Sequence, residues 1–144
     1  MTENKTKTLI YEKCWIPVFF GIGILAVFSS SAIASEFKVE WEWKKENVCY
    51  YKSPQINLKN VPVETTKLSI SMEDLERRGN YHGGGSVDYG GKGTVPKGAL
   101  VNFKGPCPPD GEHRYEITVI AYDKTGKNLA KGIGMRKCCA NLSK

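Results

Sequence analysis

The sequence has only two histidines, no internal repeats and a single long apolar run among its 144 residues. No segment carries the 3.6-residue apolar period of a long amphipathic helix, which argues against an α-helical class. No basic run with interleaved aromatic residues is present, so no nucleic-acid partner is expected. No serine lies in the G-x-S-x-G pattern of a hydrolase nucleophile. We therefore expect neither a helical bundle nor a serine hydrolase.

The single apolar run lies near the N-terminus, after a polar stretch that contains lysines. It covers residues 14–28 and is followed by small residues that end in Ala-Ile-Ala. This order is typical of a secretory signal peptide that is cleaved after Ala34. An uncleaved membrane anchor is the alternative, but a span needs about 20 apolar residues, and this run is shorter and contains Pro17. We expect a signal peptide at residues 1–34, a periplasmic or secreted mature protein, and no stable membrane insertion after cleavage.

Residues 35–144 have the length of one ordinary domain. The formal net charge of the whole chain is +6, and its basic residues are scattered. A solvated basic surface is the simplest interpretation, and attraction of small anions or lipid headgroups is the functional one. We therefore expect a single domain over residues 35–144.

Four of the five cysteines lie beyond the predicted cleavage site: Cys49, Cys107, Cys138 and Cys139. An even number of cysteines in a small exported domain indicates two disulfides. A zinc site is the alternative, but the C-x₂-C spacing of structural zinc sites is missing. Because a bridge between adjacent residues is strained, we expect Cys138 and Cys139 each to bond one of the other two cysteines.

Apolar residues that alternate with polar ones predict several β-strands. The first covers residues 37–43, where Trp41 and Trp43 share a face, and we expect it at a sheet edge. The most regular strand is followed by a glycine-containing hairpin turn, so the next strand returns antiparallel to it. The other expected strands are residues 56–58, 66–72, 87–89, 99–103, 115–122 and 129–137. This pattern predicts an all-β fold, a small antiparallel β-sandwich.

Both histidines lie in segments that are rich in proline, glycine or carboxylates. Residues 105–115 end in His113 and Tyr115, whose i, i+2 spacing places them on one side of a strand. His82 follows an acidic cluster that contains Asp74. Histidines bind phosphate, a carboxylate can orient an imidazole, and a tyrosine hydroxyl can donate a hydrogen bond. The sequence therefore predicts a small anion pocket, with buried structural residues as the alternative.

Two other classes of function are consistent with the same residues. His82, His113 and Asp74 have the composition of a metal site with two histidines and one carboxylate, as in a metal-dependent hydrolase. An exported inhibitor or interaction domain would instead contact a protein partner through Trp41 and Trp43.

The run Gly-Pro-Cys-Pro-Pro-Asp-Gly-Glu-His-Arg-Tyr at residues 105–115 resembles the second signature motif of the phosphatidylethanolamine-binding proteins. This family is also called Raf kinase inhibitor-like, and the bacterial members are the most similar. The Ser-Pro at residues 53–54 and the Val-Pro at residues 61–62 are similar to an upstream run of the family. The acidic cluster at residues 73–76 and His82 lie where the family has an Asp-Pro-Asp motif and its next histidine.

The resemblance implies a β-sandwich with a small pocket at one end that binds phosphate-like groups such as phospholipid headgroups. It implies no enzymatic reaction and no cofactor. The chain departs from the family at Leu75, which replaces a proline, and lacks the usual C-terminal helical segment. We therefore expect a shortened, non-enzymatic member. The positions that match the family's pocket and its loop are Asp74, His82, Gly105, Pro106, Pro109, His113 and Tyr115.

Overall fold

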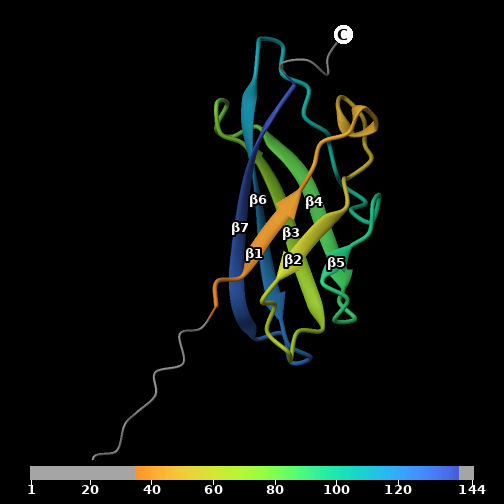
Figure 1. Ribbon diagram of the computed structural model, residues 1–144, viewed down its shortest axis with the longest axis vertical. Helices are drawn as coiled ribbons and strands as arrows, with labels where there is room; N and C mark the ends of the chain where they lie inside the picture. The colour runs from red at the N-terminus through yellow and green to blue at the C-terminus, as the bar shows by residue number, and fades with distance from the viewer. Residues whose placement is uncertain (1–34, 140–144) are drawn as a thin grey trace, which may run out of the picture. The chain divides into compact units, whose positions relative to one another are not determined.

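The computed structural model describes residues 35–139. The predicted signal peptide at residues 1–34 lies outside the described residues, as do residues 140–144. The described chain contains seven strands and one short 3-10 helix, η1 (Figure 1). Their bounds are β1 Lys38–Trp41, η1 Lys45–Asn47, β2 Ile56–Lys59, β3 Lys67–Asp74, β4 Tyr81–Asp88, β5 Thr94–Val95, β6 His113–Tyr122 and β7 Asn128–Cys138.

The strands form one sheet in the order β4-β3-β6-β7-β1-β2-β5. Neighbouring strands are antiparallel except β1 and β7, which are parallel. In Figure 1, β1 and β2 cross in front of β3 and β6, so the sheet folds over on itself into two layers. The predicted all-β sandwich is therefore confirmed, with one parallel pair where the sequence predicts antiparallel pairing throughout.

The core lies between the inner faces of these two layers. Every second residue of β3 and β6 is buried, as the alternating sequence predicts, and examples are Leu68, Ile70 and Ile117. Burial of one such side chain contributes about 1.5–3 kcal/mol, so the shared apolar face holds the layers together. The opposite wall of the core consists of Val39, Trp41, Ile56 and Leu58 from β1 and β2.

The predicted edge position of the first strand is wrong, because β1 lies between β7 and β2. Trp41 is only 1% exposed, and Trp43 packs edge-on against it with a ring separation of 5.6 Å. A Cβ atom on Gly134 of β7 would lie 2.2 Å from the carbonyl oxygen of Val39, so only glycine admits β1 here. Trp41 is therefore a core residue rather than a contact surface for a protein partner.

Residues 99–103 do not form the short strand that the sequence predicts. They turn and then run along the edge of β4, where Gly84 and Asn102 exchange backbone hydrogen bonds of 3.2 and 3.1 Å. A Cβ atom on Gly83 would lie 1.6 Å from the carbonyl oxygen of Asn102. The run of three glycines therefore accommodates a neighbouring backbone at close range.

The number of disulfides is as predicted, but their pairing is not. Cys49 bonds Cys107, and Cys138 bonds its neighbour Cys139. The backbone N–H of Cys49 donates to the carbonyl of Pro106, which brings the Cα atoms of Cys49 and Cys107 to 4.6 Å. Beyond β7 the chain turns at Cys139, where φ is +93°. The prediction that Cys138 and Cys139 do not bond each other is therefore wrong.

Among the described residues, no helix has the length and apolarity needed to cross a bilayer.

Candidate functional site

Three of the predicted site residues meet where β3 ends and β6 begins. Asp74 is the last residue of β3 and is the register partner of Tyr115 on β6. His113 is the first residue of β6 and lies two positions before Tyr115, on the same inner face. The antiparallel pairing of β3 with β6 therefore brings residues 39 positions apart in sequence into contact.

Asp74 and His113 form a buried, hydrogen-bonded pair. The Nδ1 atom of His113 lies 2.7 Å from Oδ2 of Asp74, and the two side chains are 7% and 2% exposed. The other carboxylate oxygen, Oδ1, accepts the backbone N–H groups of Glu76 at 3.0 Å and Arg77 at 3.2 Å. Asp74 thus joins the turn after β3 to the start of β6.

The surroundings of this pair shift both pKa values towards the ionised forms. Burial alone would raise the pKa of Asp74, but the hydrogen bonds from His113 and from the backbone of Arg77 and Glu76 hold it below its usual value. The hydrogen bond to Asp74 raises the pKa of His113, and burial opposes this only in part. The pair is therefore a carboxylate with an imidazolium over a wider pH range than in the unfolded chain.

Linkage between protonation and folding makes the contribution of this pair depend on pH. The Asp74 contribution is present above the usual carboxyl pKa of about 3.9 and is lost as pH falls through the lowered folded value. The His113 contribution is complete below the usual imidazole pKa of about 6.5 and is lost as pH rises through the raised folded value. Urea unfolding of wild type and His113→Gln should therefore differ most between about pH 4 and pH 6.5. A difference that does not change between pH 5 and pH 9 would contradict this.

A further carboxylate lies near the second ring nitrogen of His113. Nε2 lies 3.5 Å from Oδ1 of Asp110, which in turn is 3.4 Å from the guanidinium of Arg77. Glu76 accepts both the backbone N–H and the Nε–H of Arg114 at 2.6 Å. Both ring nitrogens of His113 already lie near carboxylates, so His113 is better placed to hold the loop than to bind phosphate.

Tyr115 is completely buried and lies between the two histidines. Its ring centroid is 5.2 Å from that of His82 and 6.4 Å from that of His113, and Trp43 packs on it edge-on at 5.9 Å. Burial and the nearby Asp74 charge raise the pKa of the phenol, so it remains protonated. Within residues 35–139 its hydroxyl has no hydrogen-bond partner, which leaves a buried donor unsatisfied.

His82 is held on the other side of Tyr115 by the segment that borders β4. The backbone N–H of Lys104 donates to the carbonyl of His82 at 2.8 Å, and His82 Nδ1 lies 3.0 Å from the carbonyl oxygen of Lys104. This second contact requires a proton on Nδ1. Nε2 lies 3.5 Å from the amide nitrogen of Asn80, so it accepts a hydrogen bond from this amide.

A cavity of about 340 Å³ opens beside His82. Of the predicted site residues, His82 and Gly105 line it, whereas Asp74, His113 and Tyr115 do not. The other residues that line it are Cys49, Tyr50, Tyr51, Asn80, Tyr81, Lys104 and Cys107.

Gly105 and Pro106 shape this cavity through the backbone. The N–H of Gly105 donates to the carbonyl of Tyr50 at 2.7 Å, and a Cβ atom on Gly105 would lie 1.8 Å from the carbonyl oxygen of Asn47. Pro106 is buried, and its carbonyl accepts a hydrogen bond from the backbone N–H of Cys49. Pro109, in contrast, is exposed. The structure thus divides the predicted set into a cavity group around His82 and a buried pair, Asp74 and His113.

Sequence reasoning missed the basic and aromatic residues that line the cavity. Lys104, Tyr50, Tyr51 and Tyr81 come from three segments, and no motif marks them. If the Cys49–Cys107 disulfide had been known in advance, it would have placed Tyr50 and Tyr51, which follow Cys49, beside the proline-rich loop that contains Cys107.

No three histidine, cysteine, aspartate or glutamate side chains of residues 35–139 come together as a group that can hold a metal ion. Of the predicted metal ligands, Asp74 and His113 are in contact. His82 lies on the other side of Tyr115, where its Nδ1 atom is hydrogen-bonded to the carbonyl of Lys104.

Comparison with known proteins finds a family model that matches part of the chain and solved structures with a similar fold. A model of the phosphatidylethanolamine-binding protein family matches residues 79–139. Solved structures with a similar fold include the following two. One is Escherichia coli YbcL, described as a new member of the mammalian PEBP family, with 18% identity and a TM-score of 0.55 over 72% of this chain and 98% of that one. The other is CT736 of Chlamydia trachomatis, a putative phosphatidylethanolamine-binding protein homolog, with 20% identity and a TM-score of 0.53 over 74% and 93%. No curated protein matches the sequence significantly.

Proposed function

We propose that this chain, of which residues 79–139 match the phosphatidylethanolamine-binding protein family model, is an exported, non-enzymatic protein that binds a small anion in the His82 cavity. The observation that carries the proposal is the shared lining of this cavity by His82, Lys104 and three tyrosines. Two disulfides in a chain of this size support export, because such bonds persist in oxidising compartments.

The charge of the cavity lining suits an anion. No carboxylate is among its described lining residues, and Lys104 supplies a cation. His82 adds a ring nitrogen, Nε2, that Lys104 does not engage, while Nδ1 is bonded to the Lys104 carbonyl. We therefore expect a small anion to bind beside His82 and Lys104.

The size of the cavity limits the ligand. A volume of about 340 Å³ is at the lower end of small-molecule sites, which span roughly 300–1,000 Å³. This suits phosphate or a phosphorylated headgroup such as phosphoethanolamine. A free phosphate monoester and the headgroup of an intact phospholipid share this chemistry, and binding to vesicles of the intact lipid would distinguish them.

Titration with inorganic phosphate, followed by histidine NMR signals, tests the proposal. The ring signals of His82 should shift with saturation, and His113 should respond less because Asp74 and Asp110 occupy its surroundings. His82→Asn retains an amide donor for the Lys104 carbonyl but removes Nε2. It should weaken phosphate binding by about tenfold or more, the loss expected for one charge-assisted hydrogen bond.

Lys104→Gln should weaken phosphate binding to a similar degree, whereas Lys127→Gln in the β6–β7 turn serves as the matched charge control. Silent His82 signals up to millimolar phosphate would reject the anion pocket. Equal effects of Lys104→Gln and Lys127→Gln would show that only the overall charge matters.

A further inference from the structure

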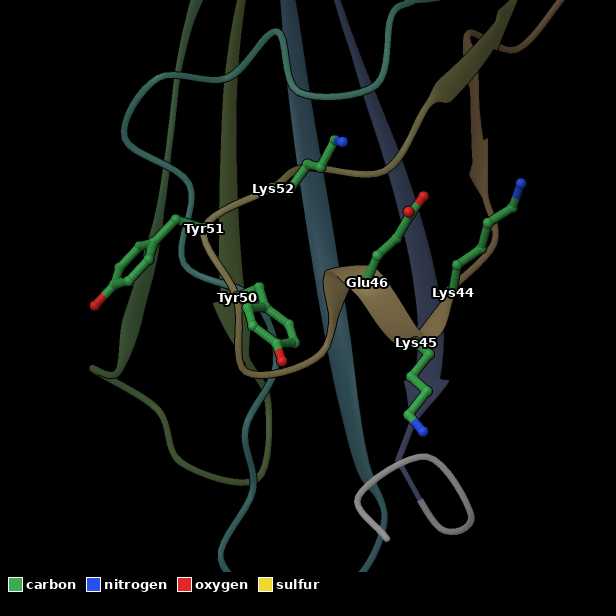
Figure 2. A pocket seen from close by; sticks show the side chains of 6 residues that line it. All are labelled: Lys44, Lys45, Glu46, Tyr50, Tyr51 and Lys52. Carbon is green, nitrogen blue, oxygen red and sulfur yellow. The ribbon is translucent and has the colours of Figure 1, made fainter.

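The connection between β1 and β2 presents a second hollow on the surface. We call residues 44–52 the lysine–tyrosine loop; it contains η1 and the adjacent tyrosines Tyr50 and Tyr51, which are 62% and 78% exposed. The hollow has a volume of about 860 Å³ (Figure 2). Its described lining comes entirely from this loop: Lys44, Lys45, Glu46, Tyr50, Tyr51 and Lys52.

The loop is rigid although its side chains are exposed. The buried amide of Asn47 ties the two ends together, because its Oδ1 accepts the N–H of Lys44 at 2.9 Å and its Nδ2 donates to the carbonyl of Lys52 at 3.0 Å. The Cys49–Cys107 bond attaches the middle of the loop to the proline-rich segment. A partner therefore meets tyrosines whose backbone is already ordered, which lowers the entropic cost of binding.

The charge of this hollow is positive. Its single described carboxylate, Glu46, is ion-paired at 2.9 Å with Lys97, which lies outside the lining. Among the described residues, none of Lys44, Lys45 and Lys52 forms an ion pair. The lining therefore combines three lysines with two exposed phenol rings, and its positive charge attracts an anionic partner.

We propose that the lysine–tyrosine loop binds an acidic oligosaccharide. The faces of sugar rings carry C–H groups that pack on aromatic rings, and tyrosine offers a large contact area at low conformational cost. Lysine ammonium groups are point charges for the sulfate, phosphate or carboxylate groups of such a chain. Charge complementarity thus selects an acidic sugar over a neutral one.

An anionic bilayer is the other partner that lysines and tyrosines attract. Surfaces that enter the headgroup region place Leu, Phe or Trp on their apolar side. None of the six described lining residues is aliphatic or tryptophan, and the surface is hollowed. These observations favour the oligosaccharide.

The inference goes beyond the proposed anion pocket and does not depend on it. Tyr50 and Tyr51 line both the hollow and the His82 cavity, so the two sites adjoin. The three lysines line the hollow but not the His82 cavity. Substitution of the lysines therefore separates the two sites experimentally.

Calorimetric titration of the purified protein with a heparin-derived sulfated hexasaccharide tests this inference, with maltohexaose as the neutral probe. Wild type should bind the sulfated probe more weakly as salt rises, and should bind maltohexaose at least about tenfold less tightly. Lys44→Gln/Lys45→Gln/Lys52→Gln and, separately, Tyr50→Ala/Tyr51→Ala should each weaken binding of the sulfated probe by about tenfold or more. Because all these side chains are exposed, the variants should keep the melting temperature of wild type.

The matched control is Lys124→Gln/Lys127→Gln, in the exposed turn between β6 and β7, which should change affinity for the hexasaccharide by less than about twofold. His82→Asn should leave hexasaccharide binding intact even where phosphate binding is lost, and the lysine variant should show the reverse.

Three results would overturn the inference. They are no binding of the hexasaccharide at millimolar concentration, an equal loss in the control variant, and unchanged affinity in the tyrosine variant. Binding to phosphatidylglycerol vesicles without binding to the hexasaccharide would identify the loop as a membrane contact instead.

Discussion

Replacement of Asp74 by alanine is expected to lower the free energy of unfolding by about 3–5 kcal/mol, the cost of breaking a buried charge pair by removal of one partner. The carboxylate accepts three hydrogen bonds, from the His113 ring and from the backbone of Glu76 and Arg77. Alanine leaves these donors unsatisfied beside the buried Tyr115 hydroxyl, which already lacks a partner among the described residues.

Urea unfolding at pH 6 measures this loss. Asp88→Ala is the matched control, since Asp88 is an exposed carboxylate near the end of β4, and it should change stability by less than about 0.5 kcal/mol. Asp74→Asn should lose less than Asp74→Ala, because the amide oxygen can still accept the backbone N–H groups. A loss below about 1 kcal/mol in Asp74→Ala would show that the pair is not a buried structural unit.

Removal of the Cys49–Cys107 bond by the double substitution Cys49→Ala/Cys107→Ala should cost about 4 kcal/mol. The two cysteines are 58 positions apart, so the bond restricts a long loop of the unfolded chain. It also attaches the lysine–tyrosine loop to the segment that lines the His82 cavity, so both binding sites should lose affinity in this variant.

The second disulfide provides the internal comparison. Cys138 and Cys139 are adjacent, so their bond closes no loop and restricts the unfolded chain very little. Cys138→Ala/Cys139→Ala should therefore cost less than the Cys49 and Cys107 variant, mainly through the loss of two buried sulfur atoms. Equal losses in the two variants would contradict the chain-restriction argument.

Much of the fold follows from local sequence patterns. Period-two alternation in β3 and β6 predicts their buried faces, because successive side chains of a strand point to opposite sides. The turn at residues 123–127 predicts the return of β7, and β7 indeed brings Cys138 opposite His113. The position of β1 could not be predicted in the same way, because it depends on the two glycines of β7 that leave room for it.

The candidate site shows the same division. The composition of two segments indicated Asp74, His82, His113 and Tyr115, and the structure brings Asp74 and His113 into a hydrogen bond. It also separates their surroundings, since His113 faces carboxylates while His82 lies beside Lys104 and an open cavity. Whether these residues bind a ligand remains a prediction, and the phosphate titration tests it.

By itself, the sequence determined the fold class of the protein, an all-β sandwich with two disulfides in the described chain, and a motif that resembles the phosphatidylethanolamine-binding proteins. These properties follow from local periodicity, cysteine number and one long motif. Each of these can be recognised from neighbouring residues or from a residue count, without knowledge of the tertiary structure. Only the tertiary structure decided which cysteines bond, which histidine faces a cavity, and that Tyr50 and Tyr51 lie beside it. Those outcomes depend on long-range backbone contacts that no local pattern encodes. An example is the hydrogen bond from the N–H of Cys49 to the carbonyl of Pro106.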